Sequence, residues 1–199
     1  AHNTREVNYF CSRNEVKVEL FYATEGSTDN TKELIQSYFK DKNIPGKLIQ
    51  EPFKDFGHNR TLALKAAKGM ATYLLFLDAD MKLVISPDFN KQSLTADAYM
   101  IQQGSTEFKY FNMRLVKSTL DFSCVSPTHE YYKLPEKCKQ EQLFTLFIND
   151  IGDGGCKENK FRRDITLLMK GIEEEPENGR YYFYLANSYF SKCSIFISI

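Results

Sequence analysis

Two aspartates separated by one alanine, Asp78 and Asp80, have the residue type and spacing that bind a divalent cation. In an extended chain their side chains project to the same side. Two carboxylates after a strand suit Mg²⁺ or Mn²⁺ that bridges a diphosphate, although such pairs also occur in ordinary turns and helix caps. The apolar run Tyr73–Leu77 precedes them and is expected to be buried. Two carboxylates at the end of a buried strand repel each other unless a positive charge lies nearby. This context favours a cation-binding site.

Two basic side chains could complete such a site. His129 would add an imidazole to the two carboxylates, a mixture that favours Mn²⁺ over Mg²⁺, or it is a structural hydrogen-bonding group. Arg60 lies at the start of an expected helix, where an arginine can bind a phosphate through two parallel hydrogen bonds. An ion pair with Asp55 explains Arg60 equally well. The sequence leaves both pairs of alternatives open.

Strands and helices alternate through the first eighty residues. Strands are predicted at 16–23, 47–53 and 73–77, and helices near 30–39 and 58–70. This order is typical of a doubly wound α/β sheet, in which ligands collect at the carboxyl ends of the strands. The segments 26–30 and 78–80 both follow strands, so we expect them to face one crevice. The almost wholly apolar run at 73–77 is predicted to be a central parallel strand.

The sequence changes character after Pro87. Strands without long helices between them are expected at 98–101, 108–116 and 143–148, which predicts an antiparallel extension of the sheet. From about Lys160, apolar residues recur at helical spacing, and a second helix begins near Asn178. Two such helices form an αα-hairpin, the unit of helical repeats. We expect an α/β domain at 1–157 and a helical hairpin at 158–199 that packs against it.

The composition excludes several classes of protein. The chain has 199 residues, and its 26 basic and 26 acidic side chains balance, which argues against binding nucleic acid through bulk charge. No apolar run approaches the roughly 20 residues that cross a bilayer. The five cysteines are odd in number and form no C-x-x-C pair, which favours reduced thiols over a zinc cluster or a disulfide scaffold. We therefore expect a cytoplasmic protein without a membrane span.

Three segments, in order and at suitable spacing, resemble family 2 glycosyltransferases of the GT-A fold: Glu25–Thr31, Asp55–Arg60 and Leu75–Asp80. The later segments 129–131, 164–168 and 182–186 look like the subgroup with C-terminal tetratricopeptide-like repeats. The resemblance covers roughly residues 12–192. It implies transfer of a sugar from a nucleotide-sugar donor to an acceptor hydroxyl, usually with inversion and a divalent cation. The acceptor, whether a glycan, a lipid or a protein, stays open.

The resemblance also implies roles for individual residues. The nucleotide-sugar donor would contact Thr24, Glu25, Asp29, Asp55, Arg60 and Asp78. The metal, Mn²⁺ or Mg²⁺, would be held by Asp78, Asp80 and His129. The base that deprotonates the acceptor hydroxyl is expected at Glu130 or Asp153.

One position departs from the family pattern. Family members usually have an aspartate, which holds the nucleotide base, where this chain has Thr24. We therefore expect weak donor binding, and a second hypothesis is a degenerate transferase that acts as a protein-interaction module through its helical hairpin. A nucleotidyltransferase is the third alternative. It would normally show a glycine-rich basic loop after the first strand, and the sequence shows none.

Overall fold

The computed structural model describes residues 20–24, 30–43, 46–50, 52–78, 80–105, 107–151 and 160–197. Of residues 20–24, 31, 46–47, 49–50 and 192–197, only the backbone is described. The elements, in chain order, are β1 (Leu20–Thr24), α2 (Thr31–Asp41), β2 (Gly46–Gln50), α3 (Phe56–Ala67), β3 (Tyr73–Leu75), β4 (Met81–Ile85), the 3₁₀ turn η1 (Lys91–Ser93), β5 (Ala98–Gly104), β6 (Lys109–Lys117), β7 (Ser123–Val125), β8 (Tyr131–Lys133), β9 (Gln140–Asp150), α4 (Lys160–Glu174) and α5 (Gly179–Ile197). This mixed α/β fold with two C-terminal helices confirms the predicted fold class.

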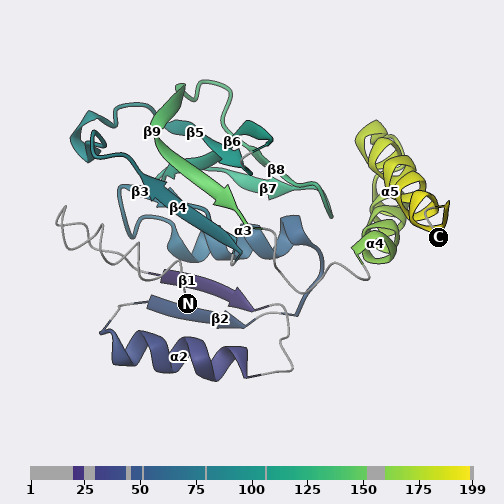
Figure 1. Cartoon of the computed structure of the whole chain (residues 1–199), viewed down its shortest axis with the longest axis horizontal. Coiled ribbons are helices and arrows are strands. Elements are labelled where there is room, and N and C mark those ends of the chain that lie inside the picture. The colour runs from purple at the N-terminus through teal and green to yellow at the C-terminus, as the bar shows by residue number, and fades with distance from the viewer. Residues whose placement is uncertain are drawn as a thin grey trace.

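The first described unit is a parallel pair of strands connected through a helix. β1 and β2 pair in a register that places Leu20 opposite Gly46 and Thr24 opposite Gln50. Helix α2 lies between them in the chain, and Asn30 occupies its N-cap position without a side-chain cap hydrogen bond. Figure 1 shows α2 beside β2, while α3 lies beside β1. The predicted alternation of strands and helices is thus present.

The larger sheet has five strands among the described residues, in the order β3-β6-β5-β9-β4. β5 and β9 are parallel, and the other neighbouring strands in this sheet are antiparallel. The antiparallel extension predicted after Pro87 is therefore confirmed. A separate small sheet pairs β7 with β8. Strands β4, β7 and β8 were not expected from the sequence.

The strand predicted at 73–77 is shorter than expected and lies elsewhere in the sheet. Among the described strands, β3 is at the edge and is antiparallel to β6, so the prediction of a central parallel strand was wrong. The apolar pattern has another origin, because Phe76 follows the strand and stacks on Tyr132 with ring centroids 4.8 Å apart. Phe122 lies beside both rings. Phe76, one of the apolar residues at 73–77, therefore packs in an aromatic cluster and not in a central strand.

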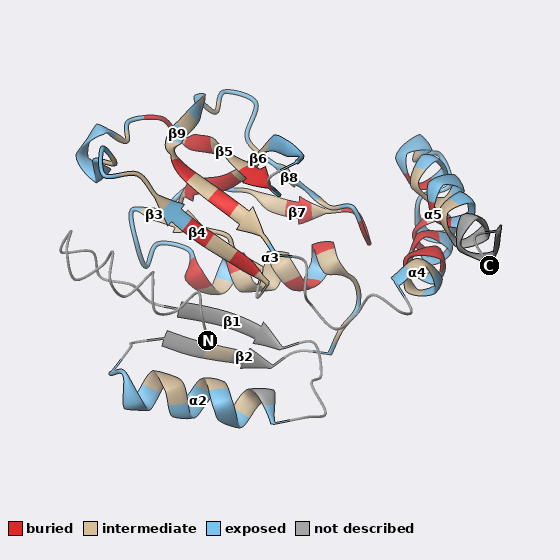
Figure 2. Ribbon diagram, in the orientation of Figure 1, coloured by how far each residue is buried: buried red, intermediate tan, exposed pale blue. Residues whose placement is uncertain are grey.

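The main hydrophobic core lies in the five-stranded sheet and the loop before β5 (Figure 2). Ile101 and Ile148, on neighbouring strands, are fully buried, as is Ala96 in the loop. The Tyr99 hydroxyl accepts a hydrogen bond from the Ala96 amide at 2.8 Å, and the Tyr73 hydroxyl donates to the Ala96 carbonyl at 2.7 Å. Because buried polar groups without partners cost free energy, these bonds hold the loop on the sheet.

Helices α4 and α5 form the predicted αα-hairpin, and the hairpin contacts the α/β part of the chain as expected. Lys54 Nζ lies 3.5 Å from the Glu174 carboxylate at the end of α4. The Arg163 guanidinium lies over the ring of Phe56, 4.8 Å from its centroid. Leu168 of α4 is fully buried. The contacts of Lys54 and Arg163 dock the hairpin beside the first turn of α3.

In the part of the chain that the structure describes, no helix combines the length and the apolar character that crossing a membrane requires. Two cysteines whose side chains are described, Cys124 and Cys138, are free thiols.

Candidate active site

One side chain, that of Arg60, joins two carboxylates that are distant in the sequence. Its Nη2 lies 2.5 Å from Oδ1 of Asp78, and its Nε donates a hydrogen bond to Oε1 of Glu130 at 2.6 Å. The three side chains are 29%, 25% and 19% exposed, respectively. They come from helix α3, the chain after β3 and the chain before β8. The structure therefore gathers three predicted site residues into one charged cluster.

The start of α3 sets the direction of Arg60. Asp55 is the N-cap in an extended backbone conformation, and its Oδ1 accepts a hydrogen bond from the His58 amide at 2.7 Å. Such a cap satisfies an amide that the helix itself leaves unpaired. Because Arg60 pairs with Asp78 and Glu130, the alternative of an Asp55–Arg60 ion pair is wrong. Asp55 instead stabilises the first turn of α3, the helix that carries Arg60.

Close contacts with β7 also fix the position of α3. The Thr61 hydroxyl donates to the Cys124 carbonyl and accepts from the Cys124 amide, both at 2.9 Å. A Cβ atom added at Gly57 would lie only 2.6 Å from the backbone oxygen of Ser126. The glycine therefore lets the helix approach the backbone at residues 124–126 closely.

A second arginine, which the sequence analysis did not select, faces Asp78 from the sheet. The Arg114 side chain is only 7% exposed, and its Nη2 lies 3.5 Å from Oδ2 of Asp78. Its Nε donates to Gln103 Oε1 at 2.6 Å, and Gln103 Nε2 donates to the Tyr110 hydroxyl at 2.5 Å. Arg114 precedes the apolar pair at 115–116 in a strand. An arginine beside apolar residues in a strand is expected to be buried, and buried arginines are normally paired. The position of Arg114 in the sequence could therefore have indicated a site residue.

Charge is closely balanced within this cluster. Burial lowers the pKa of Arg60, but the carboxylates of Asp78 and Glu130 raise it by more, so that it stays above its ordinary value. Arg60 and Arg114 thus supply the positive charge expected beside the acidic pair. Burial, assisted by the charge of Glu130, raises the pKa of the Cys124 thiol to about 12. This thiol is protonated at neutral pH and is no nucleophile.

His129 faces the hairpin. Its ring stacks on that of Tyr184 in α5, with centroids 4.1 Å apart and an interplanar angle of 8°. Burial lowers the pKa of the imidazole. No group of three potential metal-ligating side chains occurs in the described ranges, which include Asp78, Asp80 and His129. His129 therefore contacts the hairpin, and its role as a metal ligand stays a prediction.

The other predicted residues are less fully defined. Asp80 is half-buried before β4, its backbone carbonyl accepts from the Ile151 amide at 3.1 Å, and its carboxylate forms no ion pair with a described residue. Glu25, Asp29 and Asp153 lie outside the described residues, and only the backbone of Thr24 is described.

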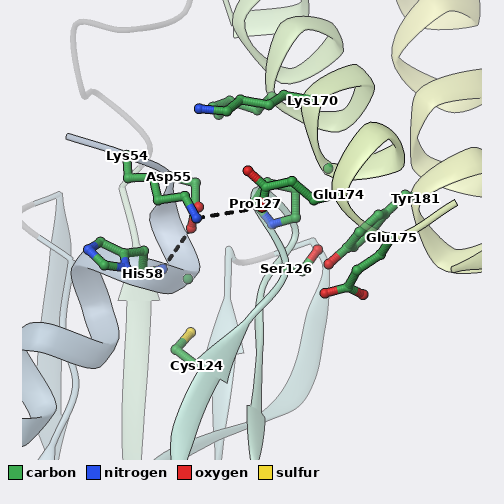
Figure 3. Close-up of a pocket in the computed structure, with 13 residues that line it drawn as sticks. Lys54, Asp55, His58, Cys124, Ser126, Pro127, Lys170, Glu174, Glu175 and Tyr181 are labelled. Atoms are coloured by element: carbon green, nitrogen blue, oxygen red, sulfur yellow. Dashed lines mark hydrogen bonds and ion pairs between the residues drawn. The ribbon is translucent and has the colours of Figure 1, made fainter.

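A pocket of about 170 Å³ opens between the first turn of α3 and the hairpin (Figure 3). Its polar lining includes Lys54, Asp55, His58, Lys170, Glu174 and Tyr181. Basic and acidic side chains are mixed there, and Lys54 is paired with Glu174. Arg60, Asp78 and Glu130 do not line this pocket, so it is distinct from the charged cluster.

Comparisons with known proteins show similarity to a protein family and to solved structures. Residues 8–90 match the model of glycosyl transferase family 2, a segment that contains Arg60, Asp78 and Asp80 and spans less than half of the chain. Among solved structures, the crystal structure of S. aureus TarS 1–349 in complex with UDP is similar, with 13% sequence identity and a TM-score of 0.49. The similarity covers 94% of this chain and 68% of that one. No curated protein matches.

Proposed function

We propose that this chain is a glycosyltransferase that moves a sugar from a nucleotide-sugar donor to an acceptor hydroxyl with inversion. The observation that supports the proposal is the Arg60 cluster, which joins Asp78, from the segment that matches glycosyl transferase family 2, to Glu130 beyond it. Arginine beside carboxylates in a mostly buried setting suits a site where phosphate groups arrive and leave.

The donor diphosphate binds at Arg60 in this proposal. A guanidinium forms two parallel hydrogen bonds to a phosphate, and this geometry is also available to carboxylates. The diphosphate therefore competes with Glu130 and Asp78 for Arg60. Arg114, anchored through Gln103, stays with Asp78 and limits the charge left unpaired.

Release from Arg60 gives Glu130 its chemical role. The freed carboxylate accepts the proton of the acceptor hydroxyl as the hydroxyl oxygen bonds to the anomeric carbon. The bond between that carbon and the diphosphate oxygen breaks, and the electron pair leaves with the diphosphate, whose charge Arg60 stabilises. A positioned base of this kind contributes roughly 10²–10⁴-fold in rate. Asp153, the other base predicted from the sequence, lies outside the described residues.

A divalent cation, Mn²⁺ or Mg²⁺, is proposed at Asp80 and Asp78. Proteins commonly hold Mg²⁺ through one or two carboxylates while substrate phosphates complete the shell, so the site does not require His129. The Asp80 carboxylate fits this role because it forms no ion pair with the described residues. A cation bound there supplies charge neutralisation for the leaving diphosphate.

A protein-interaction module is the second candidate function. Helix α5 exposes Tyr182, Phe183 and Phe190 with exposed fractions of 48%, 61% and 75%. Exposed apolar residues on one helix favour contact with a partner. Donor turnover separates the two functions, because an interaction module has no need to hydrolyse or transfer a sugar.

The proposal is tested with a panel of UDP-sugars and GDP-sugars in Mn²⁺, by measuring release of the nucleoside diphosphate with and without sugar acceptors. We expect slow turnover by the wild-type chain, and a loss of about 10²-fold or more in Glu130→Gln. Glu136→Gln, which changes an exposed glutamate in the loop after β8, is the matched control. Equal turnover by wild type and Glu130→Gln would exclude Glu130 as the base, and no turnover with any donor would favour the interaction module.

A further inference from the structure

The segment that carries Glu130 lies between the charged cluster and the hairpin. Pro127 packs against α4, where a Cβ added at Gly171 would lie 3.0 Å from the Pro127 Cγ. Two residues later, the ring of His129 stacks on Tyr184 of α5. The hairpin therefore contacts this segment on both sides of Thr128, and the second of these contacts lies directly before Glu130.

One side chain of α5, Arg180, contacts both neighbours of Glu130. Its Nη2 donates a hydrogen bond to the His129 carbonyl at 2.9 Å. Its guanidinium lies 4.8 Å from the ring centroid of Tyr131 and 4.7 Å from that of Tyr184. Arginine suits this place, because its planar group can stack on aromatic rings while its N–H groups donate.

The backbone at this point needs such external support. His129 has a φ of 52°, in the left-handed region that non-glycine residues seldom occupy. Ser126 also has a positive φ, 89°, and its hydroxyl donates to the Thr128 carbonyl at 2.7 Å. Unfavourable backbone conformations persist where the surroundings hold them. The contacts of Arg180 are part of those surroundings.

We propose that Arg180 is a positioning residue, which holds the backbone on both sides of Glu130 and thereby places the Glu130 carboxylate at Arg60. The helical hairpin then forms part of the support of the candidate active site. The placement of Glu130 follows from the geometry alone, whereas its consequence for sugar transfer rests on the proposed function.

The placement is tested by the energetic coupling between Arg60 and Glu130. The coupling comes from urea unfolding of Arg60→Gln, Glu130→Gln and the double variant, measured in the wild-type background and again with Arg180→Ala. We expect the coupling to fall to about half or less when Arg180 is removed. Arg180→Lys, which keeps a cation over the two rings, retains more of it. Arg162→Ala changes an exposed arginine of α4 and leaves the coupling unchanged. An unchanged coupling in Arg180→Ala overturns the proposal.

The consequence for transfer is measured separately. If Glu130 is the base, Arg180→Ala lowers kcat for donor turnover about ten- to hundredfold while KM for the donor changes little, because a misplaced catalytic group affects the chemical step. A change confined to KM contradicts the positioning role. A wild-type chain without turnover overturns the proposed function, and the coupling measurement still decides whether Arg180 places Glu130.

Discussion

Arg60 and Glu130 are 70 positions apart in the sequence, yet the Nε of one lies 2.6 Å from a carboxylate oxygen of the other. The pair connects helix α3, within the segment that matches glycosyl transferase family 2, to the chain before β8. The same guanidinium also reaches Asp78, so removing it leaves two mostly buried carboxylates without this partner.

Arg60→Ala should lower the free energy of unfolding. Both carboxylates lose one charged hydrogen-bond partner, and the loss of such a partner from a mostly buried group costs about 1–3 kcal/mol. Urea unfolding followed by circular dichroism measures the effect. Lys65→Ala, an exposed basic residue on the same helix, should change stability by no more than about 0.5 kcal/mol. Equal losses in the two variants would mean that the cluster contributes nothing specific to folding.

Gly57→Ala should destabilise the chain by about 1–3 kcal/mol, because the added Cβ would lie 2.6 Å from the Ser126 backbone oxygen and force α3 away from β7. Gly179→Ala is the matched control. A Cβ there has no neighbour within 4 Å, and alanine is favoured over glycine in a helix by up to about 1 kcal/mol. Thermal unfolding of both variants checks the prediction, and a neutral Gly57→Ala would show that the close approach is unnecessary.

Asp55→Ala should cost about 0.5–2 kcal/mol through loss of the hydrogen bond to the His58 amide. Asp55→Ser keeps an oxygen that can accept this hydrogen bond and should recover most of the stability. Chemical denaturation of the three proteins distinguishes a capping role from a charge effect. If serine is as destabilising as alanine, the charge of Asp55 matters more than its cap.

Cys124 should make stability depend on pH in the alkaline range. Its pKa in the folded chain is raised to about 12 from an ordinary value of 9.0, so its contribution is complete below pH 9 and is lost as the pH rises toward 12. Denaturant unfolding at several pH values in this window should show stability falling with pH, and the fall should be shallower in Cys124→Ala. An identical slope in the variant would mean that other groups account for it.

We expect a bound cation to depend on the carboxylate of Asp80 and not on the imidazole of His129. Because His129 stacks on Tyr184, paramagnetic broadening by Mn²⁺ should be lost in Asp80→Ala and kept in His129→Ala. Broadening that disappears in the histidine variant would show that the imidazole is a ligand after a rearrangement of the hairpin.

Local patterns in the sequence were sufficient for much of the fold. Helical spacing located α3, α4 and α5 within a few residues, and the hairpin and its docking followed from apolar spacing. The run at 73–77 was misplaced because continuous apolar sequence does not say what covers it, and here the aromatic rings of Phe76, Phe122 and Tyr132 lie together.

Only part of the candidate site was predicted, because the rest depends on contacts between residues that are distant in the sequence. Residue type and spacing selected Arg60 and Asp78, and Glu130 was one of two positions expected for the base; the structure brings these three side chains together. The partner of Arg60 could not be predicted, because it depends on contacts across 70 positions. The direction of the His129 side chain depends on a left-handed backbone angle and on the hairpin, and neither has a signature in the sequence.

Calorimetric titration of UDP and GDP into the wild-type chain, Arg60→Ala and Lys65→Ala, with and without Mn²⁺, tests the central claim most directly. We expect UDP and GDP to bind wild type and Lys65→Ala weakly and similarly, and only with Mn²⁺, because this chain has Thr24 where the resemblance to family 2 glycosyltransferases implies a base-binding aspartate. Arg60→Ala should lose about five- to 150-fold in affinity, the equivalent of about 1–3 kcal/mol. Binding of either nucleotide that is unaffected by Arg60→Ala would contradict a diphosphate site at this cluster, as would the absence of any binding by the wild-type chain.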